Sequence, residues 1–356
     1  MHPLQPLPLP STIILETPEV LRQLAKAHRY LAELKGSAST IPNESILIDT
    51  LALQEAKDSS AIENIITTQD ELFQADTWAG SYASAAAKEV HNYGAALKIG
   101  FEKVRRQGFL RLDDILTVQA ALEQNRAGLR KLPGTVLKNA QTGSTVYEPP
   151  QDAIAIERLM DNFVTHLNQN EPGDADPLVR MAVLHHQFES IHPFYDGNGR
   201  TGRILNLLHL VMHGLLDLPV LYLSRHIVRN KSGYYHHLQT VRESGKWEEW
   251  LLYMLRGVEI TARETLLQVQ AIRELMQETK QRLRGNHPRI YSQELLNNLF
   301  RHPYTKIEFI ERDLGVSRPT AMKYLQALTS AGFVKKIKIG RTNFYVNEPL
   351  FALLSR

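Results

Sequence analysis

One run near the middle of the chain has the side chains needed to bind phosphate groups and to move a proton. It reads His-Pro-Phe-Tyr-Asp-Gly-Asn-Gly-Arg-Thr-Gly-Arg and spans residues 192–203. His192 is the residue of this run whose pKa suits proton transfer near neutral pH. Arg200 and Arg203 are one helical turn apart, so both guanidinium groups can meet one polyphosphate. Asp196 offers a hard oxygen ligand, which suits Mg²⁺ shared with phosphates.

The segments on both sides of this run have helical spacing, which places the chemistry on a loop between two helices. Apolar side chains recur three or four apart over residues 178–191, and the spacing returns from Ile204. Pro193 cannot continue the first helix. Gly197 and Gly199 let backbone N–H groups approach an anion at the positive end of the second helix. This arrangement predicts phosphoryl or nucleotidyl transfer.

Three other interpretations of this region are weaker. Gly197-x-Gly199-x-x-Gly202 matches the dinucleotide-binding fingerprint, but a helix precedes it where that fold needs a strand. The P-loop pattern fails, because no Gly-Lys-Ser/Thr follows a spaced glycine here. His185 and His186 lack the HExxH spacing of zinc proteases, and neighbours on a helix point about 100° apart. We therefore expect His185 to be a buried core residue.

The run resembles the core motif of the Fic family, His-x-Phe-x-Asp/Glu-Gly-Asn-Gly-Arg-x-x-Arg, with every defined position present. Residues 147–150 and 234–250 are also similar to family members with a Fic N-terminal domain, and the likeness covers about residues 8–285. The resemblance implies a mainly α-helical Fic bundle with a β-hairpin flap. It also implies a nucleotidyltransferase that moves AMP from ATP to a Ser, Thr or Tyr hydroxyl of a target protein.

The resemblance assigns roles to individual residues. His192 would take the proton of the attacking hydroxyl, Asp196 would hold Mg²⁺ between the α- and β-phosphates, and Phe194 would anchor the loop. Tyr235 would lie beside the nucleotide. The Asn198 side chain would join the backbone amides of the anion hole, and the nucleotide-binding set is Gly197, Asn198, Gly199, Arg200, Thr201, Gly202 and Arg203. The flap, residues 133–147, would pair with the backbone of the target through Val136, Leu137 and Lys138.

A second short run resembles the inhibitory motif of the family, Ser/Thr-x-x-x-Glu-Gly/Asn. It comprises Ser59, Glu63 and Asn64, and Ser59 and Glu63 share one helix face. The resemblance implies that Glu63 pairs with Arg203 and occupies the donor that should hold the γ-phosphate. The plainer interpretation is a solvated glutamate at a helix end. In some relatives the same glutamate assists removal of AMP, so a de-AMPylating hydrolase is an open alternative.

Residues 287–356 predict a small α+β domain of the winged helix-turn-helix kind. Thr305 and Glu308 have the spacing of a capping box, a second helix follows over 318–331, and a hairpin follows over 334–346. This segment has 11 basic and 5 acidic residues, a net charge of +6, whereas the rest of the chain has −3. The alternative function is therefore a nucleotide-sensing regulator that binds DNA. Winged helices also serve as protein-docking or dimer modules.

Composition and spacing divide the chain into a helical N-terminal layer (1–80), a Fic core (81–284) and the C-terminal domain (287–356). The chain has no Cys, which excludes a disulfide scaffold, a thiolate zinc site and a cysteine nucleophile. The stretch Ile204–Leu223 has histidines, Asp217 and Pro219, which are costly in hydrocarbon. We therefore expect a cytoplasmic protein without a membrane span. Relatives of this layout also suggest a homodimer.

Overall fold

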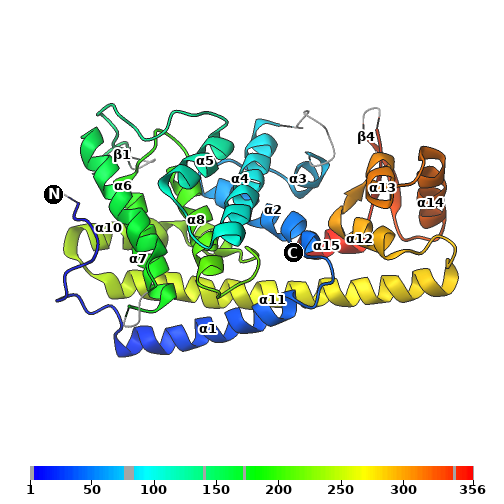
Figure 1. Ribbon diagram of the computed structural model, residues 1–356, viewed down its shortest axis with the longest axis horizontal. Coiled ribbons are helices and arrows are strands. Elements are labelled where there is room, and N and C mark those ends of the chain that lie inside the picture. The colour runs from blue at the N-terminus through cyan, green and yellow to red at the C-terminus, as the bar shows by residue number, and fades with distance from the viewer. Residues whose placement is uncertain (1–3, 76–83, 139–141, 171–173, 340–341, 356) are drawn as a thin grey trace.

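A single helix, α11 (Trp247–Asn286), runs along most of the molecule in the computed structural model, and most of the other elements lie above it in the view of Figure 1. The structure describes residues 4–75, 84–138, 142–170, 174–339 and 342–355. The predicted boundary at residue 80 lies outside these ranges, as do residues 139–141 of the flap and residues 340–341 of the C-terminal hairpin. The molecule is mainly α-helical, as expected.

The N-terminal layer is built from two helices with different surroundings. Helix α1 (Pro18–Ala38) lies along α11, and Thr17 begins it by accepting the Val20 N–H at 3.3 Å. Helix α2 (Glu44–Ile62) is buried on nearly all sides and packs against α4 and α9. A short helix, α3 (Gln69–Ala75), follows it. The inhibitory run therefore lies at the carboxyl end of a helix inside the molecule.

The central bundle holds the sequence run 192–203 between two buried helices, α7 (Pro177–Ile191) and α8 (Asn198–Met212). The hairpin flap consists of β1 (Leu137–Lys138) and β2 (Thr145–Tyr147), which pair antiparallel with Leu137 opposite Tyr147. The remaining helices of the bundle are α4 (Ala85–Gln107), α5 (Leu112–Glu123), α6 (Ala153–Asn168), α9 (Leu223–Arg229) and α10 (Lys231–Ser244).

The C-terminal body has the element order of the expected winged helix, with added helices at both ends. A three-stranded antiparallel sheet has the strand order β3-β5-β4. The elements are α12 (Gln293–Arg301), β3 (Tyr304–Thr305), α13 (Ile307–Leu314), α14 (Arg318–Ser330), β4 (Lys335–Ile339), β5 (Thr342–Val346) and α15 (Glu348–Leu354).

The predicted capping box at Thr305 and Glu308 is wrong. Lys306 stands at the N-cap of α13, and no side chain caps that helix. Thr305 lies in strand β3, where its buried hydroxyl donates to Asn298 Oδ1 at 2.7 Å. The tertiary hydrogen bond to α12 replaces the local one that the spacing suggested.

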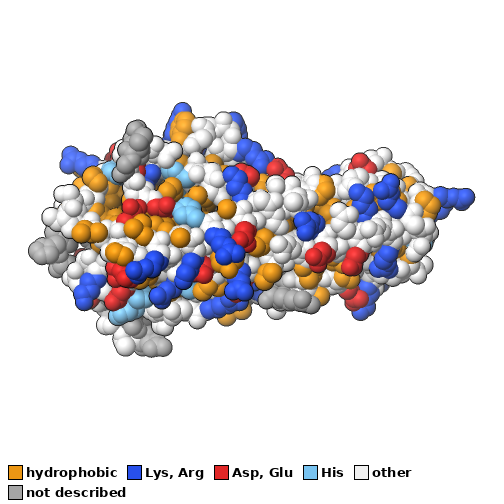
Figure 2. All heavy atoms as spheres, turned by 90° about the horizontal axis from the view of Figure 1, so that it is seen from below, with side chains coloured by type: hydrophobic (Ala, Val, Ile, Leu, Met, Phe, Trp, Pro, Cys, Tyr) orange, Lys and Arg blue, Asp and Glu red, His pale blue; other side chains and the backbone are white. Residues whose placement is uncertain are grey.

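The surface shows how charge is distributed over the molecule. On the face in Figure 2, basic and acidic side chains are interspersed along the length of the protein. None of the helices in the described ranges is long and apolar enough to cross a membrane. The apolar stretch from Ile204 is helix α8, which ends at Met212 and lies in the core of the bundle.

Candidate functional site

His192 ends helix α7 in the left-handed conformation, with φ 49° and ψ 59°, and its N–H donates to the Phe188 carbonyl at 2.9 Å. The loop then reaches Gly197, which has φ 75° and begins α8. A Cβ at residue 197 would lie 2.2 Å from Glu123 Oε1. Both the backbone conformation and the close carboxylate therefore require glycine here.

Two buried side chains, Phe194 and Asn198, fix the loop between His192 and Gly197. Phe194 is fully buried, as expected of an anchor. The Asn198 side chain is buried too, with Oδ1 accepting the Phe194 N–H and Nδ2 donating to the Phe194 carbonyl, both at 2.8 Å. We expected this side chain in the anion hole. It instead braces the loop, and the group that Asn198 can offer a phosphate is its backbone N–H.

Arg203 and the end of α2 meet at the amino end of α8. Arg203 is 2% exposed; its Nε donates to Ser59 Oγ at 2.8 Å, and its Nη2 donates to the Ser59 carbonyl at 3.0 Å and to Glu63 Oε1 at 2.8 Å. A Cβ at Gly199 would lie 2.5 Å from Glu63 Oε1. The Glu63 carboxylate therefore rests against the first turn of α8, where backbone N–H groups have no partner within the helix.

The charges of Glu63 and Arg203 stabilise each other. Burial alone would raise the pKa of Glu63, but Arg203 outweighs it and holds the pKa below its usual value. Burial would likewise lower the pKa of Arg203, yet Glu63 raises it. Asn64 follows with φ 63°, and its Oδ1 accepts from Lys231 Nζ at 3.1 Å. The left-handed turn at residue 64 explains why glycine or asparagine suits this position.

Arg200 lies in a different environment from Arg203. Its Nη1 donates to Glu89 Oε2 at 2.7 Å and its Nη2 to Glu123 Oε1 at 2.9 Å, and its side chain is 4% exposed. The two arginines therefore contact different carboxylates, although their spacing predicted one shared anion. A nucleotide phosphate that reaches Arg200 has to compete with Glu89 and Glu123.

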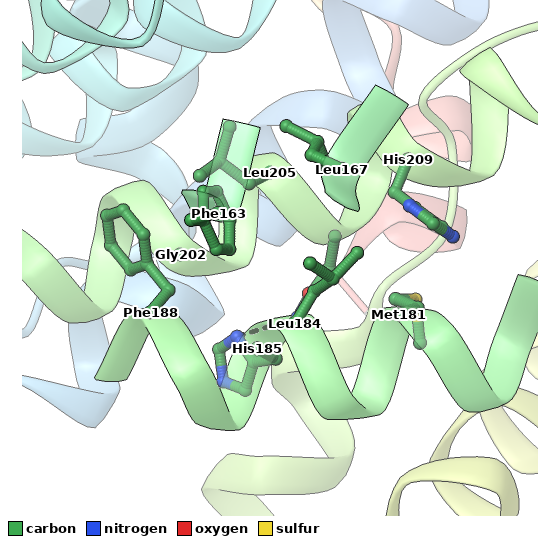
Figure 3. Close-up of a pocket in the computed structure, with 10 residues that line it drawn as sticks. Phe163, Leu167, Met181, Leu184, His185, Phe188, Gly202, Leu205 and His209 are labelled. Carbon is green, nitrogen blue, oxygen red and sulfur yellow. Dashed lines mark hydrogen bonds between the residues drawn. The ribbon is translucent and has the colours of Figure 1, made fainter. Parts of the chain in front are cut away.

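The predicted nucleotide-binding residues Thr201 and Gly202 lie on the core side of α8. Thr201 is fully buried. Gly202 lies near Phe188 and His185 at a small cavity between α6, α7 and α8 (Figure 3), and a Cβ there would be 3.1 Å from the Phe188 ring. These two residues support the packing of α8 against α7.

His185 is the buried core histidine that the sequence predicted. Its Nε2 lies 2.8 Å from the Tyr234 hydroxyl, and its Nδ1 lies 3.1 Å from Asn206 Nδ2. Burial lowers the pKa of His185 to about 3, so the ring is neutral at physiological pH.

His192 is also held in its neutral form. Burial lowers its pKa to about 4, and the charges of Arg130 and Arg242 act in the same direction, while Glu63 opposes them. A neutral imidazole can accept a proton, so the ring is ready to act as a base at pH 7. The sequence singled out neither arginine. Both contact the end of α7 from far along the chain, so no local spacing could have revealed them.

The remaining predicted residues are all at least partly exposed to solvent. Asp196 is exposed, and one of its oxygens, Oδ1, accepts the Gly197 N–H at 2.7 Å. Tyr235 is 46% exposed, with its ring 5.1 Å from that of Tyr234. On the flap, Val136 and Leu137 are half-buried and Lys138 is exposed.

Comparisons with known proteins agree with this site. Family models match three successive parts of the chain: the Fic/DOC family N-terminal region at residues 21–102, the Fic/DOC family at 109–210, and the C-terminal domain of SoFic-like protein adenylyltransferases at 275–350. The protein thus belongs to the Fic/DOC family.

Curated relatives match over shorter stretches. The protein adenylyltransferase Fic of Aedes aegypti is 30% identical over 156 residues, which are 44% of this chain and 29% of that protein. The protein adenylyltransferase fic-1 of Caenorhabditis elegans is 39% identical over 66 residues, 18% of this chain and 12% of that protein. The matched region therefore spans less than a third of these two relatives.

Solved structures share the fold at low sequence identity. A Fic family protein from Desulfovibrio desulfuricans G20 has a TM-score of 0.58 and 19% identity, with 93% of this chain and 96% of that chain covered. Fic-1 from C. elegans has a TM-score of 0.53 and 21% identity, with 71% and 74% covered.

Proposed function

We propose that this protein is a protein adenylyltransferase, which transfers AMP from ATP to a Ser, Thr or Tyr hydroxyl of a target protein. The observation that carries the proposal is the loop between α7 and α8. It joins the neutral base His192, at the end of α7, to the first turn of α8, where no side chain caps the helix and Arg203 is buried. The name protein adenylyltransferase that curated relatives bear supports the same activity.

The proposed reaction uses the residues as follows. The hydroxyl oxygen attacks the α-phosphorus of ATP, the bond from that phosphorus to the oxygen bridging the β-phosphate breaks, and pyrophosphate leaves. His192 accepts the hydroxyl proton; its Nδ1 is buried, so Nε2 is the nitrogen that meets the hydroxyl. The amides at the start of α8 and Arg203 bind the phosphates and offset their charge.

The family implies Mg²⁺, and the residues present fit it. Asp196 is exposed at the loop, and the hydrogen bond from the Gly197 N–H orients its carboxylate. A hard carboxylate oxygen beside a phosphate site is the donor that Mg²⁺ prefers. When bound, the ion would neutralise phosphate charge and orient the pyrophosphate leaving group.

We further propose that Glu63 inhibits the enzyme. Its carboxylate occupies both the Arg203 guanidinium and the space over Gly199, the two features that should hold the γ-phosphate. ATP can then bind with its phosphates displaced from the productive position.

Transfer of label from α-labelled ATP tests both statements. We expect the Glu63→Gly protein to label itself or proteins in a cell lysate strongly. The wild type should label them weakly, and Glu63→Gly/His192→Ala should give no detectable label. Mass spectrometry then identifies the attached group. Absence of label from every variant overturns the proposed activity, and equal labelling by wild type and Glu63→Gly overturns the inhibition. Loss of AMP from pre-modified protein in the presence of Glu63 would indicate the hydrolase alternative.

A second candidate function is DNA binding by the C-terminal body. The outer face of α14 exposes Lys323 and Gln326, and strand β4 exposes Lys336 and Lys338, as a groove-binding helix and a backbone-binding wing require. A mobility-shift assay at two salt concentrations tests this candidate. No binding at low salt excludes it, and binding that Lys336→Glu/Lys338→Glu abolishes supports it.

A further inference from the structure

Arg130 is a fully buried arginine whose contacts are backbone carbonyl groups of the catalytic loop and the flap. Its Nε donates to the His192 carbonyl at 2.7 Å, and its Nη2 donates to the carbonyls of Ile191, at 3.2 Å, and Pro150. Its own N–H donates to the Pro193 carbonyl at 2.9 Å. Among the described residues it has no carboxylate partner within ion-pair distance. Burying a cation without a carboxylate partner is unfavourable, so the hydrogen bonds to these carbonyls must offset the loss of solvation.

Arg242, on α10, contacts the same helix end from the other side. Its Nε donates to Ser190 Oγ at 3.1 Å and its Nη2 to the Glu189 carbonyl at 3.2 Å. Its guanidinium carbon lies 4.1 Å from the centre of the Tyr147 ring, and the Tyr147 hydroxyl donates to the Ser190 carbonyl at 3.0 Å. We call Arg130 and Arg242 the arginine clamp.

The clamp and Tyr147 together satisfy every carbonyl at the end of α7. The last carbonyls of a helix have no partner within it and carry partial negative charge. Here a donor from the clamp, the Arg130 backbone or Tyr147 meets each of Glu189, Ser190, Ile191, His192 and Pro193. The left-handed conformation of His192 is unfavourable in a non-glycine residue, and these bonds offset that cost.

We propose that Arg130, assisted by Arg242, is a positioning residue that fixes the His192 backbone and joins it to the return strand of the flap. The inference rests on the proposed transfer reaction, in which the flap presents the target to His192. Tyr147 ends the return strand β2, which pairs with the target-binding strand β1, and Pro150 follows closely, so the base and the flap share one support. The charges of Arg130 and Arg242 face the His192 ring together with Glu63, and Glu189 lies one turn earlier on α7.

The test combines a direct titration of His192 with transfer kinetics in a Glu63→Gly background. Nuclear magnetic resonance of histidine-labelled protein, with the His192 signal assigned by its loss in His192→Ala, gives the pKa without need of activity. In Arg130→Met we expect this pKa to rise above about 4, because the facing cation is gone while burial, the larger cause of the lowered pKa, remains. We also expect kcat to fall about 100-fold with the KM for ATP unchanged, since the base is misplaced.

Two variants separate positioning from simple structural support. Arg130→Lys keeps the charge but loses the forked bonds, so kcat should fall while the His192 pKa stays near 4. Arg126→Met is the matched control, because Arg126 lies exposed in the same loop and should change neither quantity. If Arg130→Met does not fold, Arg130→Lys decides, and an unchanged kcat there overturns the proposal.

An unchanged His192 pKa in a folded Arg130→Met protein also overturns it, whatever happens to kcat. If the Glu63→Gly background transfers no AMP at all, the proposed function fails, and the titration still decides whether the clamp acts on His192.

A separate set of contacts ties the inhibitory helix to the C-terminal body on both sides of Glu63. Upstream on α2, the buried Asp49 pairs with Arg301 of α12 and with Lys98. Downstream on α3, Asp70 accepts from the Tyr304 hydroxyl, and the Phe73 ring lies 6.0 Å from the Phe351 ring in an edge contact.

We propose that the C-terminal body holds α2 in the inhibitory position, so that a ligand of this body can change the activity of the site. The inference rests on the inhibitory role of Glu63. Its physical basis is that the segment 49–73, which contains Glu63, is attached at both ends to elements of residues 293–354. Displacement of those elements therefore moves the helix that carries the carboxylate.

Labelled-ATP transfer by wild type, Glu63→Gly, Arg301→Ala and the double variant, with two further variants, tests this coupling. We expect Arg301→Ala to raise transfer about threefold to tenfold over wild type, and to add nothing in the Glu63→Gly background, where the carboxylate is already absent. Arg289→Ala, at an exposed arginine of the same region, is the control and should match wild type. Tyr304→Phe removes the hydrogen bond to Asp70 and should also raise transfer, by a smaller factor. It serves as the test variant if Arg301→Ala does not fold. Equal transfer by wild type and these variants, or an equal gain in the Glu63→Gly background, overturns the coupling.

Discussion

The two helices that meet at the site end in the same backbone conformation but are held very differently. Asn64 after α2 and His192 after α7 are both non-glycine residues with positive φ, 63° and 49°. The end of α7 is fixed by buried donors on five consecutive carbonyls. The end of α2 is held at the Arg203 guanidinium and, near the surface, by Lys231, and the Glu63 side chain is 36% exposed. The proposed base thus lies on a backbone with several buried supports, whereas the Glu63 carboxylate has one guanidinium partner and is partly exposed.

The largest expected effect is at the fixed end. In the Glu63→Gly background, His192→Ala should lower transfer about 10²- to 10⁴-fold, because a positioned base contributes that much to proton transfer. Single-turnover labelling with saturating ATP measures it. ATP binding, measured by calorimetry, should remain, and lost binding would mean that the histidine supports the fold instead.

A smaller change in transfer is expected from substitution of Glu63 at the end of α2. Glu63→Gly should raise transfer about 10- to 150-fold, the equilibrium equivalent of a charge-assisted bond of about 1.5–3 kcal/mol. Partial exposure of Glu63 favours the lower part of that range. Asn64→Gly is the matched control, since it keeps the carboxylate and suits the left-handed turn. A comparable rise in Asn64→Gly would assign the effect to the turn and contradict the role of the carboxylate.

Ser59 tests how much of the inhibition depends on the second acceptor of Arg203. Ser59→Ala removes the Oγ that accepts from Nε at 2.8 Å and leaves the Ser59 carbonyl and Glu63 in place. We expect a rise of about 2- to 12-fold in transfer, the equivalent of about 0.5–1.5 kcal/mol for one neutral acceptor. Labelling rates beside wild type and Glu63→Gly measure it, and a rise equal to that of Glu63→Gly would contradict the ranking.

The smallest expected effect is that of mild acid. The folded protein lowers the pKa of His192, so the neutral base persists as pH falls until about 4. Between pH 7 and 6 the rate of the Glu63→Gly protein should change less than about twofold, whereas a histidine of pKa 6.5 would lose about threefold. Burial raises the pKa of Glu189 to about 7, so that group titrates in this window and belongs in the fit. A threefold loss that follows the measured His192 titration would contradict the lowered pKa.

The core helices and the contact between Glu63 and Arg203 could be predicted from the sequence, and the supports of the site could not. The second helix of the C-terminal domain, expected over 318–331, is α14 at Arg318–Ser330. Helices α3, α9 and α15 have seven residues each, too few for a periodic pattern to stand out.

The resemblance to the family paired Glu63 with Arg203, because both positions are defined within short motifs. The partners of Arg200 are a different case, since Glu89 and Glu123 lie 111 and 77 residues away. The contacts of Arg130 likewise go to backbone carbonyls, which carry no residue identity in a sequence. Long-range contacts of this kind are set by tertiary packing alone.

The continuity of α11 sets a fixed spacing within the molecule. Its 40 residues correspond to about 60 Å of unbroken helix, and it lies under both the central bundle and the C-terminal body (Figure 1). A continuous helix of this length keeps the two parts of the molecule at a constant distance from each other. Any macromolecule held by the outer face of α14 would present to His192 only those hydroxyl groups that lie at the matching distance, so substrate choice would depend on geometry as well as on local sequence.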